Sequence, residues 1–144
     1  MNYDKIDGYL VDIFNNVVII EEASLKNSKF NDVSLKEMHT IDVIGTHPDT
    51  TPSAVAKELM LTLGTVTTSL NKLEKKGYIV RTRSSVDRRV VHLSLSKKGR
   101  LVYRLHRRVH KSMVMRITEG FNDEELKVMS KGLENLHAFL EELK

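Results

Sequence analysis

At 144 residues, 40% of them hydrophobic, the chain is long enough for one core and a dimer surface but leaves no room for a separate catalytic domain. It contains no cysteine, which excludes a disulfide and suits a reducing cytoplasm, and its first residues lack the pattern of a secretion signal. The net charge of +4 is unevenly spread, because residues 81–116 carry twelve Lys and Arg against one acid. One side of the molecule should therefore attract a polyanion.

The first predicted element is an apolar-rich helix over about residues 4–23. Phe14 and Val18 widen its apolar stripe beyond what a single surface helix needs, which predicts burial on two sides. A polar, loop-like segment should follow it. The segment Ser34–Glu37 has the spacing of a capping box, so a second helix is expected to begin there and to end near Gly45.

Residues 51–77 divide into two short helices with a tight break between them. Thr51 and Thr62 are positioned to cap the two helices, and Gly77 is positioned to end the second. In the second helix, apolar residues share one face, while hydroxyl, amide and lysine side chains occupy the other. An ordinary two-helix corner would fit this pattern too, but such polar side chains suit base edges and phosphates. The predicted DNA-contacting residues of this region are Thr62, Thr65, Thr67, Thr68, Asn71 and Lys72.

Two β-branched segments follow, Tyr78–Arg83 and Val90–Leu95, and they read as the strands of a hairpin. The polar tip between them contains Asp87, Arg88 and Arg89. A solvated loop is the simpler interpretation of this tip. The alternative is a wing in which Asp87 holds one guanidinium while an arginine reaches a phosphate or the minor groove.

Two more helices complete the chain. Ser96 should cap a long helix to about Thr118, with an apolar stripe (Leu101, Leu105, Val109, Met113 and Ile117) in the core and a basic opposite face. A second capping box over residues 122–125 starts the last helix, whose leucines and Met129 form a heptad seam. That seam could pack within the chain or against a second copy.

The order of these features resembles the MarR family of winged-helix transcriptional regulators over essentially the whole chain. The residues that carry the resemblance are LEKKGYIVR at 73–81, DRR at 87–89 and LSKKG at 95–99. Residues 13–45 and 66–81 further resemble the family's fatty-acid-biosynthesis repressor subgroup, known as FabT. Many family members carry an arginine where this chain has Thr68, so base readout there should differ.

The resemblance implies a mainly α fold with a small β-hairpin wing and a homodimer built from the first and last helices. Residues 1–33 and 97–144 would form the dimerisation stem, and residues 34–96 the winged helix-turn-helix domain. Two such domains related by a two-fold axis would read an imperfect palindrome in double-stranded DNA. The expected function is a cytoplasmic repressor, with no enzyme activity and no cofactor.

The resemblance also implies acyl-acyl carrier protein as a co-repressor. An elongated apolar cavity for its acyl chain could be lined by Phe14, Val17, Val18, Leu35, Met38, Met60, Val109 and Met113, although apolar residues at helical spacing are more often core. Carrier proteins are acidic, so the basic residues Arg104, Arg107, Arg108 and Lys111 are candidate docking residues.

A metal-responsive regulator is the alternative function. His106 and His110 are spaced to share a metal, and His39, Glu21 or Glu22 could complete the site. The missing cysteine and the adjacent Arg107 and Arg108 argue against it. No phosphate-binding loop, activated nucleophile or carboxylate pair predicts an enzyme. A basic amphipathic helix at a membrane surface would also use the Arg100–Arg116 segment, but no membrane partner is expected.

Overall fold

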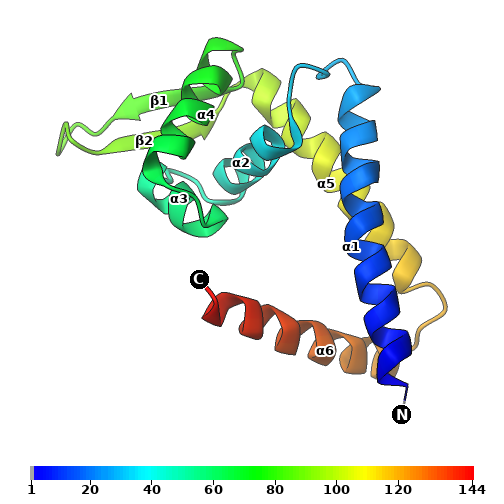
Figure 1. Ribbon diagram of the computed structural model, residues 1–144. Helices are drawn as coiled ribbons and strands as arrows, with labels where there is room; N and C mark the ends of the chain where they lie inside the picture. The colour runs from blue at the N-terminus through cyan, green and yellow to red at the C-terminus, as the bar shows by residue number, and fades with distance from the viewer. Residues whose placement is uncertain (1) are drawn as a thin grey trace.

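The computed structural model describes residues 2–144, which form helices and one antiparallel hairpin (Figure 1). This confirms the mainly α fold with a β wing. Most boundaries lie within one residue of those predicted, but α1 continues past Ala23 because the Asn27 N–H caps its last turn. In chain order the elements are α1 (Tyr3–Lys26), α2 (Leu35–Thr46), α3 (Pro52–Leu59), α4 (Leu63–Lys75), β1 (Ile79–Arg83), β2 (Val91–Leu95), α5 (Lys97–Ile117) and α6 (Asp123–Glu142).

The helix starts are set by local hydrogen bonds, as the capping patterns predicted. Ser34 and Glu37 make a reciprocal capping box at α2, and an equivalent box opens α6. The Thr51 hydroxyl oxygen accepts a hydrogen bond from the Ala54 backbone N–H, and the Thr62 hydroxyl oxygen accepts one from the Thr65 N–H, each at 3.2 Å. Between α3 and α4 the chain turns at Met60, which has the left-handed φ of 53°. The helix-turn-helix is therefore held by its own caps.

One compact core joins α2, α3, α4 and the hairpin. The most completely buried side chains come from all of these elements, and from α5 through Val102. The strands pair antiparallel from Ile79–Leu95 to Arg83–Val91, and Thr50 adds a bridge to Leu93. This bridge attaches the turn before α3 to the wing, so the wing and helix-turn-helix form one packed unit.

Gly99 fixes how α5 leaves the wing. A Cβ atom at Gly99 would lie 2.0 Å from the backbone oxygen of Tyr78, a distance that only glycine tolerates. The Ser96 N–H donates to the same oxygen, and the Ser96 hydroxyl donates to the Gly77 carbonyl. The glycine of the LSKKG segment therefore lets α5 begin directly against the end of α4 and the start of β1.

The packed face of α5 differs from the predicted one. Val102 and His106 are buried, whereas Leu101 and Ile117 of the predicted core stripe are 39% and 53% exposed. The buried residues are one position, or about 100°, around the helix from that stripe. The reason is packing against α2, which uses the side of α5 that also carries Gly99.

The stem helices α1 and α6 are only lightly packed within a single chain (Figure 1). α6 contains no fully buried residue, and the most covered residues of its seam, Leu126, Met129 and Leu136, are only half-buried. The predicted burial of α1 on two sides is likewise absent in one protomer, where Phe14 is 56% and Val18 43% exposed. No helix within residues 2–144 combines the length and apolarity that crossing a membrane would require.

Candidate nucleic-acid interface

α4 presents its predicted polar face to solvent. Val66, Leu70 and Leu73 are at most 1% exposed and hold the helix on the core. A groove of about 310 Å³ runs between this helix and the first turn of α2, where Ser34 and Lys36 form its other wall. The predicted residues Thr62, Thr65, Thr67, Thr68, Asn71 and Lys72 are all exposed. The structure therefore brings this set together on one surface.

The threonine hydroxyls of this surface are partly committed to the helix itself. The Thr62 and Thr65 hydroxyls lie 2.8 Å apart, and the Thr68 hydroxyl donates to the Gly64 carbonyl at 3.1 Å. Thr68 therefore presents an acceptor oxygen and a methyl group, since its hydrogen is used internally. Such short side chains would let the helix backbone approach DNA closely and favour contacts between their methyl groups and bases.

Asn71 is tied to the hairpin. Its Oδ1 accepts a hydrogen bond from Arg81 Nη2 of β1 at 2.8 Å, and Arg81 also lies 3.8 Å from Glu74. Bidentate recognition of adenine needs both the oxygen and the nitrogen of the amide. The Arg81 hydrogen bond occupies one lone pair of Oδ1, so Asn71 still offers its amide nitrogen and the second lone pair. Arg81, which was not predicted as a site residue, orients the amide. Only the hairpin fold brings Arg81 to α4.

The wing tip separates the roles of its two arginines. Asp87 accepts from the Arg89 backbone at 3.0 Å and from the Arg89 guanidinium at 3.2 and 3.3 Å. These bonds, the backbone one first, lower the pKa of Asp87. Arg83 donates to the Arg88 carbonyl and braces the loop. Within residues 2–144 the Arg88 guanidinium has no recorded partner. The predicted pairing by Asp87 is therefore with Arg89; both arginines are exposed, but only Arg89 is paired.

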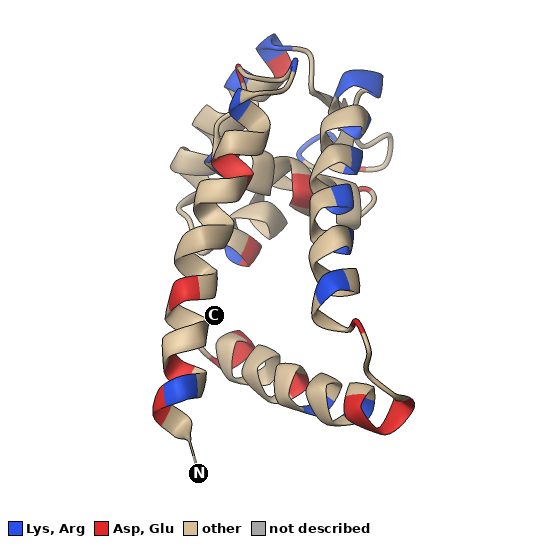
Figure 2. Ribbon diagram, turned by 90° about the vertical axis from the view of Figure 1, so that its right-hand side faces the viewer, with Lys and Arg blue, Asp and Glu red and all other residues tan. Residues whose placement is uncertain are grey.

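The basic face of α5 is visible as blue segments repeated along that helix (Figure 2). Arg104, Arg108 and Lys111 are exposed, as the docking prediction requires. Arg107 is instead engaged by α2, because its Nε lies 3.4 Å from Asp42 Oδ1 and its Nη2 donates to the Thr46 hydroxyl. Asp42 Oδ1 receives no hydrogen bond of good geometry, so this contact is an ion pair only. Arg107 is thus the least available member of the set.

The residues predicted to line an apolar cavity are spread over several parts of the chain. Met38 and Val109 line a void of about 10 Å³ between α1, α2 and α5, about the size of one water probe and far too small for an acyl chain. Met60 lies at the break between α3 and α4 and is 63% exposed. Phe14 and Val18 are exposed on α1, while Val17, Leu35 and Met113 are half-buried. The turn thus places Met60 on the winged-helix surface, apart from Met38 and Val109.

The histidines of the alternative metal prediction do lie together. His106 and His110 of α5 and His39 of α2 surround Glu21 of α1, whereas Glu22 is exposed and takes no part. Burial, followed by the proximity of His110, lowers the pKa of His106.

The chain is similar to known transcriptional regulators. Residues 33–91 match the model of the MarR family. The HTH-type transcriptional regulator PchR of Bacillus subtilis is 30% identical over 75% of this chain and 66% of its own length. An uncharacterised HTH-type regulator of the same organism, YwhA, is 33% identical over 69% of this chain and 73% of its own. Streptococcus pneumoniae FabT, solved in complex with DNA, is 65% identical over 99% of both chains, with a TM-score of 0.90.

Proposed function

This chain belongs to the MarR family of winged helix-turn-helix transcriptional regulators and is of the FabT type, and from this we propose that it is a dimeric repressor of fatty-acid biosynthesis genes. Acyl-acyl carrier protein is the proposed co-repressor. The DNA complex of the 65% identical FabT supports binding of duplex DNA by the corresponding surface here.

The observation that carries this proposal is the shared orientation of α4 and the wing. Both project from the winged-helix unit at the end away from α6 (Figure 1), and neither face is covered by another element of the chain. In the proposed complex α4 enters the major groove, with Thr65, Thr67, Thr68 and Asn71 toward base edges. Lys72 and Arg88 bind phosphate or the minor groove, while Asp87 and Arg89 shape the wing.

A homodimer follows from the unsatisfied apolar surface of the stem. Ile6, Phe14 and Ile20 of α1 and Leu133 and Leu140 of α6 are each at least 46% exposed in one chain. Surfaces of this kind are covered in stable proteins, and an isologous pairing covers both helices at once. The dimer would present two α4 helices to successive major grooves, so the operator should be an imperfect palindrome with half-sites about 34 Å apart.

The co-repressor proposal draws on the FabT type and on α5. Arg104, Arg108 and Lys111 are exposed, and helix spacing places them on the side of α5 opposite His106 and His110, which pair with Glu21 of α1. Such a cationic row is suited to an acidic carrier protein. The acyl chain would have to open space beside Met38 and Val109, between the stem and the winged-helix unit. A ligand wedged there changes the tilt of one against the other and thereby the affinity for DNA.

A mobility shift with the promoter of a fatty-acid biosynthesis gene tests the proposal. The protein should shift this fragment and not a scrambled duplex, and acylated carrier protein should lower the protein concentration needed. Unacylated carrier protein is the control for charge alone. Equal binding to promoter and scrambled duplex would refute specific repression, and equal effects of the two carrier proteins would refute acyl sensing.

A further inference from the structure

Glu21 is a buried carboxylate whose ion-pair partners are all histidines. It is 6% exposed, and within residues 2–144 it has no recorded lysine or arginine partner. His110 Nε2 lies 2.8 Å from Glu21 Oε1, His106 Nδ1 lies 4.0 Å from the same oxygen, and His39 Nε2 lies 3.6 Å from Oε2. A buried carboxylate needs a compensating cation, because its isolated charge is costly to remove from water. Imidazole nitrogens and a carboxylate oxygen gathered in this way are also ligands that zinc prefers.

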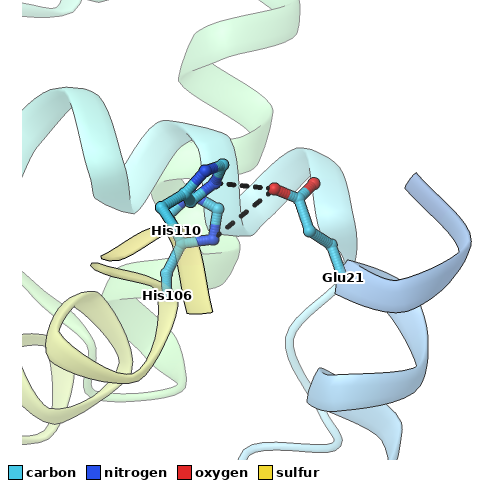
Figure 3. A group of neighbouring side chains, drawn as sticks. All are labelled: Glu21, His106 and His110. Atoms are coloured by element: carbon cyan, nitrogen blue, oxygen red, sulfur yellow. Dashed lines mark ion pairs between the residues drawn. The ribbon is translucent and has the colours of Figure 1, made fainter. Parts of the chain in front are cut away.

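The side chains converge from separate elements (Figure 3). His106 and His110 are one turn apart on α5 and face Glu21, which comes from the C-terminal part of α1. One ligand atom from each of Glu21, His106 and His110 lies within 4.8 Å of the others. Tetrahedral zinc with bonds of about 2.0–2.1 Å places its ligand atoms about 3.4 Å apart. Small rotamer adjustments of the half-exposed His110 would bring the three ligand atoms to this spacing.

We propose that Glu21, His106 and His110 bind a divalent transition metal of the zinc class, with His39 holding the second carboxylate oxygen of Glu21. Two imidazoles and a carboxylate are a common zinc ligand set, and a fourth position would be taken by water. Carboxylates that ligate a metal are commonly held by a further side chain in this way. A metal bound here would join the three ligands directly, in place of the ion pairs that Glu21 makes with His106 and His110.

The neighbouring arginines do not oppose a cation here. Arg107 is turned toward α2, where Asp42 pairs with it and Thr46 accepts its hydrogen bond. Arg108 is exposed, and it lies two residues from His106 and from His110, which places it about 160° around the helix from both. The charges that weighed against a metal in the sequence are therefore neutralised or directed away from Glu21.

A metal at this position would join α1 of the stem to α5 beside α2 of the winged-helix unit. It would also stiffen the wall of the void lined by Leu25, Met38 and Val109. Its effect on DNA affinity rests on the proposed repressor function, whereas metal binding itself does not. The coupling is reciprocal: if bound metal changes the affinity for the operator by some factor, bound operator changes the affinity for the metal by the same factor.

The test is zinc titration of the chelator-stripped full chain in competition with a chromophoric chelator. One equivalent per chain should bind, His110→Gln should abolish competition, and His39→Gln should weaken binding about 10- to 100-fold. His137→Gln is the matched control, because His137 is an exposed histidine on α6 with a glutamate partner at 3.8 Å. Absence of stoichiometric binding, or equal binding by the His110→Gln and wild-type proteins, would overturn the site.

Circular dichroism of each stripped variant confirms that it is folded, so that loss of zinc is not loss of structure. The same preparations are then assayed for operator binding with and without zinc. Operator binding by a protein that takes up no zinc would refute this site and leave the repressor function standing. Stoichiometric zinc uptake without any operator binding would support the site and refute the repressor function.

Discussion

Replacement of the two wing arginines, one at a time, should have unequal effects on DNA binding. Asp87 pairs with the guanidinium of Arg89, so part of that positive charge is already neutralised within the wing. Arg88 has its carbonyl held by Arg83 but its guanidinium exposed. Arg88→Ala should therefore remove a full phosphate contact, whereas Arg89→Ala should mainly loosen the loop and expose Asp87.

The magnitude follows from counterion release. A dimer has two wings, and each lost phosphate contact lowers the slope of log affinity against log salt by about 0.9, or about 1.8 in total. Between about 50 and 200 mM salt, wild-type protein should thus lose about 12-fold more affinity than Arg88→Ala. Arg89→Ala should change the slope by less, because its charge is shared with Asp87.

Fluorescence anisotropy with a labelled operator, repeated at four or more salt concentrations, measures both slopes. Lys127→Ala is the matched control, because it removes one positive charge from α6, where Lys127 is 73% exposed and paired with Glu124. Its slope should equal that of wild type. Two results would refute the division of roles within the wing. One is a salt slope for Arg88→Ala equal to that of wild type; the other is a larger change of slope in Arg89→Ala than in Arg88→Ala.

Four further changes test other parts of the structure. Asn71→Ala should relax base preference by about 1–3 kcal/mol at one operator position, measured with single-base operator variants. Gly99→Ala should lower the free energy of unfolding in urea by roughly 3 kcal/mol, since its Cβ would clash with the Tyr78 carbonyl. Leu133→Glu should give a monomer by analytical ultracentrifugation, with weakened operator binding. The Tyr78 hydrogen bond lowers the pKa of Asp32, so its stabilising effect is lost as pH falls; Asp32→Asn should flatten the acid decline in unfolding free energy below about pH 4.

Features decided by neighbouring residues were predictable from the sequence. The caps at Thr51, Thr62 and Ser96 and the turn at Gly77 depend on hydrogen bonds and backbone angles within a few residues. The pairing within the DRR segment is likewise local, because Asp87 and Arg89 are two residues apart. These interactions require no knowledge of the tertiary fold.

Features decided by packing partners could not be predicted from the sequence. The apolar residues of α5 repeat regularly, but which side is buried depends on where α2 lies, and the stripe alone does not contain that information. Arg81 and Asn71 meet only because the hairpin folds back on α4. Met60 was placed in the acyl cavity by its hydrophobicity, although the left-handed turn directs it to the surface. Each of these features depends on how separate elements are placed relative to one another.

The position of α2 explains how one junction can control DNA binding. Glu37 in its first turn pairs with Lys76 at the end of α4 at 3.0 Å, and its Met38 and Ile41 lie in the shared core. A displacement of α2 is therefore transmitted to α4 as a rigid unit rather than absorbed. On the other side, Asp42 of α2 pairs with Arg107 of α5, and His39 contacts Glu21 of α1. An acyl chain inserted beside Met38 and a cation bound at Glu21 would thus act on the same helix, and each would change the separation of the two α4 helices that the operator measures.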